Sequence, residues 1–134
     1  MATGKRMALT LLGVMIVAGC GTGCGTGEQD AKASAAAAAN EFLLALEHPD
    51  EACRLLAPEA LAVVEQDGRR CADALPELRL SYGEAREITV WSVRALVRTN
   101  SDTLFLIERE TGWQITAAGC VPAEDVTYQC VLAS

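Results

Sequence analysis

The amino-acid sequence predicts an α+β fold in which N-terminal helices pack on one face of a four-stranded antiparallel sheet. Two observations lead to this prediction. Residues 31–78 have apolar side chains at helical spacing and prolines that suit helix starts. Residues 86–120 alternate apolar and polar side chains and are rich in β-branched types, which is typical of strands. Because the helices precede the strands, they are expected to share one side of the sheet.

The first helix is expected over residues 31–47. Alanine, the best helix former, dominates its first half. Ala35 and Ala39 begin an apolar stripe that Phe42 and Leu46 continue, so one face of the helix is expected to be buried. The alanine run alone would also suit an extended linker, but the stripe runs through it without a break.

Shorter helical segments are expected to follow. Pro49 and Pro58 each suit the first position of a helix, where the missing backbone N–H costs nothing. Gly68 is expected to end the second of these segments. A further helical turn that carries Cys71 is expected to end at Pro76.

Four strands joined by short turns are expected at residues 86–91, 93–99, 102–110 and 113–120. From residue 121 onward we expect a tail held by Cys130. The second strand has an apolar face with Val93, Ala95 and Val97, and a mixed face with Arg94, Leu96 and Arg98. On the mixed face, arginines are expected to meet Glu87 or Glu108 in cross-strand pairs, and the alternative is a partner-binding surface.

Residues 1–19 are predicted to be a signal peptide. Lys5 and Arg6 precede an apolar stretch at residues 7–18, and small residues follow it. A membrane-spanning helix needs about 20 apolar residues, so this stretch is too short to be one.

The end of this segment, Val-Ala-Gly-Cys at residues 17–20, resembles the lipobox of bacterial lipoproteins. The resemblance implies that Cys20 becomes the first residue of the mature chain and is diacylated on its sulfur, which anchors the chain to the membrane. Cys24 fits this pattern less well, because Gly21 stands where the lipobox has Leu, Val or Ile.

Cys20 and Cys24 also allow two other interpretations. One is ordinary secretory cleavage that leaves two free thiols, and the other is a metal-binding site, or metal clip, formed by the two cysteines. The metal clip lacks partners, since His48 is the only histidine and no further pair has ligand spacing. No metal and no cofactor are therefore expected.

The rest of the chain divides into a tether and one domain. Residues 20–30 are Gly-rich and polar and are expected to be flexible, whereas residues 31–134 are long enough for one core. The chain has 11 basic and 18 acidic side chains, and Lys5 and Arg6 leave with the signal peptide. Such an acidic surface repels phosphates, so nucleic acid is excluded as a partner.

The four remaining cysteines lie in the folded region, and a small exported domain gains stability from disulfides. Four cysteines allow three pairings, among which spacing does not choose. We predict a Cys53–Cys71 pair between two helical segments and a Cys120–Cys130 pair between the end of a strand and the tail. Cys24 would then be unpaired.

The order of elements resembles the NTF2-like, or cystatin-like, family, in which helices precede a curved antiparallel sheet that forms a cone. The turn and Trp at residues 110–116 resemble the entry to its last strand. Residues 42–65, 71–78 and 101–120 also look like small actinobacterial lipoproteins with this layout. The resemblance covers residues 31–130 and implies a pocket between the concave sheet face and the helices. In the enzymes of the family this pocket holds acid and base residues, but none of their motifs is matched here.

Asp73, Tyr82 and Trp91 are the candidate pocket residues. Asp73 lies in an apolar stretch and would have a raised pKa if it faced a pocket, but a solvated helix face is the favoured interpretation. Tyr82 and Trp91 would line a cavity or fill the core. His48 precedes Pro49 and is expected at a helix junction, as a cap or a surface residue and not as a catalytic base.

These observations predict a lipoprotein on the extracytoplasmic face of the cell membrane, anchored through Cys20. Its domain is expected to be a non-catalytic module that binds a small apolar ligand or an envelope protein. One alternative is a small enzyme that uses Asp73 or Tyr82 as acid or base in the cone pocket. Another is an accessory subunit of a membrane complex that uses the outer sheet face with Arg94 and Arg98.

Overall fold

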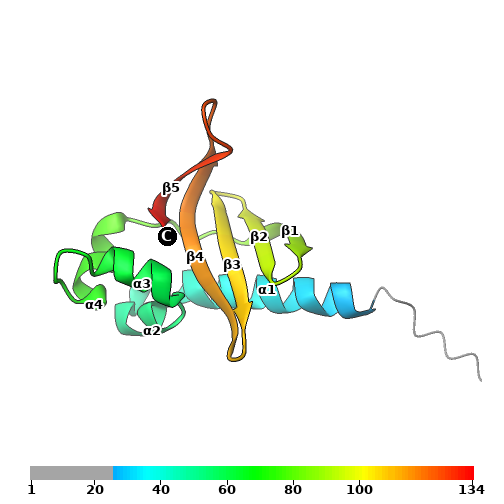
Figure 1. Ribbon diagram of the computed structural model, residues 1–134, viewed down its shortest axis with the longest axis horizontal. Coiled ribbons are helices and arrows are strands. Elements are labelled where there is room, and N and C mark those ends of the chain that lie inside the picture. The colour runs from blue at the N-terminus through cyan, green and yellow to red at the C-terminus, as the bar shows by residue number, and fades with distance from the viewer. Residues whose placement is uncertain (1–25) are drawn as a thin grey trace, which may run out of the picture.

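The computed structural model describes residues 26–134, so Cys20 and Cys24 lie outside the described residues. The fold is α+β, as expected: one long helix crosses behind an antiparallel sheet, and the shorter helices lie beside it (Figure 1). Within the described part, no helix is long and apolar enough to cross a membrane.

The long helix α1 spans Thr26–Leu44 and continues into a 3₁₀ turn, η1, at Ala45–Glu47. It begins before Ala31, so residues 26–30, which we expected in the tether, are helical. An ion pair of 3.1 Å between Lys32 and Glu28, one turn apart, supports this first part of the helix. The expected apolar stripe is buried, with no exposed surface at Ala35, Ala39 and Phe42.

The short helices are α2 (Pro49–Arg54), α3 (Pro58–Val64) and α4 (Cys71–Ala74), followed by a 3₁₀ turn η2 (Leu75–Leu78). Both prolines occupy helix starts, as expected. Pro76 does not end its helical turn, because it lies within η2, where a proline is tolerated at the start of the turn. The Cys53–Cys71 disulfide joins α2 to α4, which confirms the first predicted pair.

The sheet has five strands instead of four. They are β1 (Ala85–Trp91), β2 (Arg94–Thr99), β3 (Thr103–Arg109), β4 (Gly112–Pro122) and β5 (Tyr128–Ala133), in sequential antiparallel order. The segment expected as a tail is β5, which pairs with β4 over Ala117–Pro122. The Cys120–Cys130 disulfide, the second predicted pair, joins directly opposed residues of this hairpin.

The helix-facing side of the sheet forms the core. Its largest contributions are five side chains with at most 1% exposure that belong to one buried cluster with Phe42: Val97, Leu104, Leu106, Ile115 and Leu132. Ala95 and Val97 lie on this face as expected, but Val93 lies in the two-residue turn between β1 and β2 and is 49% exposed. Core side chains therefore occupy the place where the family resemblance implies a pocket.

The N-terminal half of β4, residues 112–116, does not pair with β5. Its open edge is covered by residues 55–57, which connect α2 to α3. The backbone N–H of Ile115 donates to the carbonyl of Leu55 at 2.9 Å, and the N–H of Ala57 donates to the carbonyl of Ile115 at 2.8 Å. These two bonds form a short parallel bridge between Leu56 and Ile115. They fix the start of α3 against the sheet edge and thereby place Glu59.

We expect Phe42→Ala to lower the free energy of unfolding by about 3–5 kcal/mol, because truncating a fully buried aromatic side chain leaves a cavity. The control is Leu44→Ala, two residues away on the same helix and 63% exposed, which should change stability by less than about 0.5 kcal/mol. Urea unfolding followed by circular dichroism measures both. Equal losses in the two variants would contradict the assignment of the buried face.

Candidate functional site

The sheet face turned away from α1 carries an unusual set of side chains for a solvated surface. In the strand register Trp91 lies opposite Arg94, Arg94 opposite Ile107, and Leu96 opposite Phe105. Directly opposed residues of antiparallel strands point to the same side of the sheet, so these five residues share one face. We call this surface, defined by Trp91, Arg94, Leu96, Phe105 and Ile107, the outer face. Figure 1 looks onto it, with α1 behind the sheet.

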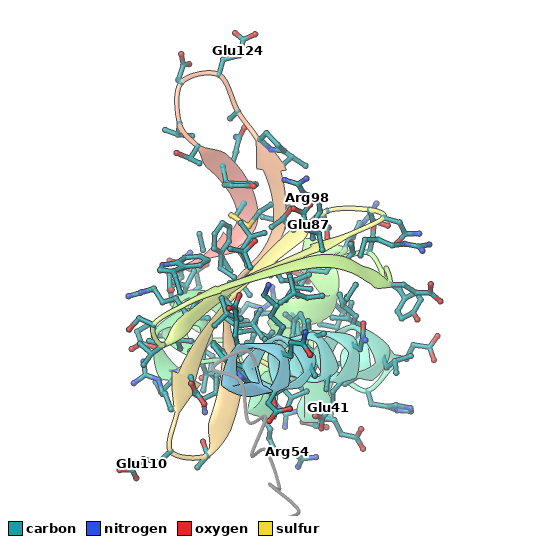
Figure 2. All side chains as sticks on the ribbon, turned by 90° about the vertical axis from the view of Figure 1, so that its right-hand side faces the viewer. Glu41, Arg54, Glu87, Arg98, Glu110 and Glu124 are labelled. Carbon is teal, nitrogen blue, oxygen red and sulfur yellow. A yellow bond between two sulfur atoms is a disulfide. The ribbon has the colours of Figure 1, made fainter. Side chains whose placement is uncertain are left out.

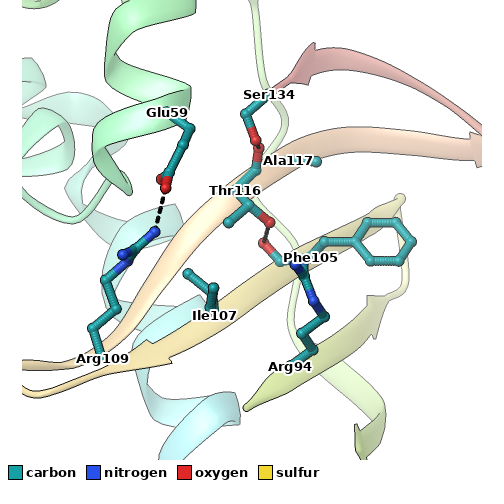
Figure 3. A pocket seen from close by; sticks show the side chains of 8 residues that line it. All are labelled: Glu59, Arg94, Phe105, Ile107, Arg109, Thr116, Ala117 and Ser134. Atoms are coloured by element: carbon teal, nitrogen blue, oxygen red, sulfur yellow. Dashed lines mark hydrogen bonds and ion pairs between the residues drawn. The ribbon is translucent and has the colours of Figure 1, made fainter. Parts of the chain in front are cut away.

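A hollow of about 370 Å³ lies on the outer face, close to the start of α3. Its floor is apolar and its two sides are charged (Figure 3). The residues that line it are Glu59, Arg94, Phe105, Ile107, Arg109, Thr116, Ala117 and Ser134.

One side of the hollow is closed by an ion pair between Arg109, at the end of β3, and Glu59, in the first turn of α3. Arg109 Nη2 donates to Glu59 Oε1, and Figure 3 shows the two side chains pointing toward one another. The pKa of Glu59 lies below its ordinary value, chiefly because its own backbone N–H donates to the carboxylate. The Arg109 guanidinium lowers this pKa further, and Arg94 adds a smaller effect.

The other side of the hollow is formed by Arg94, the first residue of β2. Its side chain is exposed, and none of the ion pairs found among residues 26–134 includes it. Figure 3 shows it reaching along the sheet toward Phe105. Arg94 is thus a cation beside an apolar floor, free to accept an external anion.

The hydroxyl groups at the hollow are already used within the chain. Thr116 Oγ1 donates to the carbonyl of Phe105 at 3.1 Å, and Ser134 Oγ donates to the carbonyl of Thr116 at 3.1 Å. These bonds tie β3, β4 and the end of β5 together beneath the hollow. The floor is therefore held in place by the sheet itself.

Toward β5 the outer face is bordered by Arg98 and Tyr128. Arg98 pairs with Glu87 across β1 and β2 at 3.1 Å, which confirms the expected cross-strand pair, and Figure 2 shows the two side by side. The Tyr128 hydroxyl group, together with Glu87, raises the pKa of Arg98. The Tyr128 ring meets the edge of the Phe105 ring, with centroids 5.1 Å apart.

The three candidate residues from the sequence lie in three different places. Asp73 is exposed on α4 and pairs with Arg70 at 3.3 Å. Tyr82 is 53% exposed and borders a separate apolar hollow near the end of α1. Trp91 is 44% exposed and belongs to the outer face. The structure therefore does not assemble an acid–base pocket from these residues.

His48 is the N-terminal flanking residue of α2, at the helix junction where we expected it. It borders a surface hollow together with Glu41 and Glu51. In the part of the chain that the structure describes, no group of three or more His, Cys, Asp or Glu side chains is arranged to hold a metal ion.

Several residues of the hollow were missed by the sequence analysis. Alternation along β3 places Phe105 and Ile107 on the same face as Leu96, and this signal was present in the sequence. The pairing of Glu59 with Arg109 joins residues 50 positions apart and depends on how α3 packs. No local pattern reports such a contact.

Comparisons with protein-family models, with curated proteins and with solved structures found no match to this chain.

We expect Glu59→Gln to lower stability at neutral pH and to have a smaller effect in acid. Because folding holds the pKa of Glu59 below its ordinary value of 4.5, the ionised carboxylate stabilises the fold above that pH. This contribution is lost as the pH falls through the lowered pKa. Urea midpoints of wild type and variant between pH 7 and pH 2.5 should therefore converge on acidification.

The control is the same substitution in an Arg109→Gln background, where part of the pH dependence should remain because the backbone N–H still donates to Glu59. If the urea midpoints of wild type and Glu59→Gln differed by the same amount at every pH, the stabilising role of the ionised Glu59 carboxylate would be contradicted.

Proposed function

We propose that this protein is a lipid-anchored, extracytoplasmic, non-catalytic binding module that holds an envelope protein on its outer face. One observation carries the proposal: the outer face combines tryptophan, arginine and aliphatic side chains, while the long helix α1 lies on the opposite side of the sheet. A sheet face that serves only as solvated surface normally carries polar residues.

The composition of the outer face suits protein binding. Trp and Arg are the residue types that most often dominate binding energy at interfaces, and here Trp91 and Arg94 are cross-strand neighbours. Leu96, Phe105 and Ile107 are half-buried, which leaves apolar surface between them for a partner.

The proposed localisation, on the extracytoplasmic face of the membrane, rests on the lipobox resemblance at Cys20 and on the two disulfides. Disulfides persist in oxidising compartments outside the cytoplasm, and both lie within the folded domain. Two acyl chains give stable membrane anchoring. Since α1 begins at Thr26, the tether from Cys20 has a reach of roughly 20 Å at most.

We also propose that the fold is a variant of the NTF2-like cone, which the order of helices and sheet supports. In this variant the inner side of the sheet is filled by core residues, so the binding site is on the outer side. The acid–base alternative places Asp73 or Tyr82 in the cone pocket, whereas Asp73 is exposed on α4 and Tyr82 is 53% exposed.

A second candidate function is binding of a small apolar ligand near the end of α1. The observation in its favour is a hollow of about 440 Å³ lined by four leucines, Glu47 and Tyr82, with Leu44 and Tyr82 more than half exposed. The leucines are Leu43, Leu44, Leu46 and Leu80.

A photo-crosslinking amino acid placed at Trp91 should give a discrete adduct with an envelope protein in intact cells. The control position is Leu44, which is more exposed but lies on the helix side. Adducts from Trp91 alone support the proposal. Adducts from Leu44 alone, or none from Trp91, would refute binding through the outer face.

Mass spectrometry of the protein purified from its own membranes tests the proposed lipid anchor and disulfides. The expected mass lacks residues 1–19, includes acyl chains on Cys20 and is lower by four hydrogens for two disulfides. An unacylated mass would rule out the lipid anchor. A small molecule released from the native protein would favour the second candidate.

A further inference from the structure

We infer that the outer-face hollow receives the acidic tip of the β4–β5 hairpin from a second copy of this chain. The inference rests on the proposed function and names the partner of the same site. It joins Arg94 of the outer face, which no ion pair found among residues 26–134 includes, to a projecting tip on which carboxylates and valines are exposed.

The β4–β5 hairpin extends well beyond the other strands (Figure 1). Its tip, residues 123–127, carries Glu124 and Asp125, and no ion pair found in residues 26–134 includes either carboxylate. Val126 is 56% exposed in the same tip, and Val121 at its base is also about half exposed. A partner on the tip would bury the exposed apolar surface of these two valines.

Two contacts fix the direction in which the β4–β5 hairpin projects from the sheet. The Cys120–Cys130 disulfide joins its strands just before the tip. The edge-to-face contact between Tyr128 and Phe105 then braces the hairpin against β3. A rigid projection loses little conformational entropy when it binds, which favours association.

The tip and the hollow are complementary in charge and polarity. Arginine is well suited to binding carboxylates, because its planar guanidinium donates two parallel hydrogen bonds. Arg109 is neutralised by Glu59, so Arg94 is the cation of the hollow available to Glu124 or Asp125. Val126 would then rest on the apolar floor at Ile107.

The contact forms between copies and not within one molecule. Figure 2 shows Glu124 at one end of the molecule and Glu110, the neighbour of the hollow residue Arg109, at the other. Because tip and hollow are different patches, each copy has one of each free, so the contact propagates into a row. One hairpin tip buries far less than the roughly 800 Å² per partner of a stable interface. Anchoring in one membrane compensates by raising the effective concentration.

The test uses the full chain in its own membranes, with the photo-crosslinker at Trp91. The expected wild-type adduct has twice the mass of the protein. Arg94→Glu should reduce it at least fivefold, and so should the tip variant Glu124→Arg with Asp125→Arg. Arg54→Glu, an exposed arginine on α2 for which the described structure gives no ion pair, is the control and should leave the adduct unchanged.

Co-expression of the Arg94→Glu chain with the tip variant should restore the adduct to within twofold, since each hollow then meets a tip of opposite charge. Near-ultraviolet circular dichroism and intact disulfides verify folding of each variant. Adducts with a different protein, insensitive to the tip variant, would overturn the second-copy partner and leave the proposed function standing. The absence of any adduct from Trp91 would overturn both.

Discussion

The packing of α1 against the sheet is the interaction on which the rest of the structure depends. Ala35 and Ala39 have no side chain beyond Cβ, so the helix backbone can lie close to the strands, and Phe42 fills the remaining depth between them. This contact determines which sheet face is inner. The side chains at the alternate positions of β2 and β3, among them Arg94 and Ile107, therefore lie on the outer face. The candidate site is thus a direct consequence of where the helix sits.

The two disulfides support segments that are weak on their own. Helices as short as α2 and α4 are unstable in water, and the Cys53–Cys71 bond holds them together. The part of the β4–β5 hairpin beyond β3 is a two-stranded ribbon, which is also marginal in isolation. The Cys120–Cys130 bond lies at the base of this ribbon, where Cys120 is also paired with Thr103 of β3. Cys71 and Cys120 are buried, so each cross-link ties a weak segment to the core.

The sequence was most informative where local chemistry decides the structure. Proline at Pro49 and Pro58 marks helix starts because of its missing N–H, and alternation along 86–120 separates the two sheet faces. The tail expected from residue 121 onward is wrong, although β5 has as many residues as β2; what establishes β5 as a strand is its pairing with β4. The prediction that Asp73, Tyr82 and Trp91 line one pocket is wrong for a similar reason. It groups them by chemical type, while tertiary packing separates them.

The early start of α1 has a mechanical consequence for how the domain is attached to the residues that precede it. A helix of 19 residues is about 28 Å long, and in Figure 1 its first turns extend past the sheet without being covered by it. A helix resists bending where a coil does not, so the first turns of α1 form a rigid extension of the domain. This extension keeps Thr26 at a fixed distance and direction from the outer face, so the point at which the domain is attached moves with that face as one rigid body.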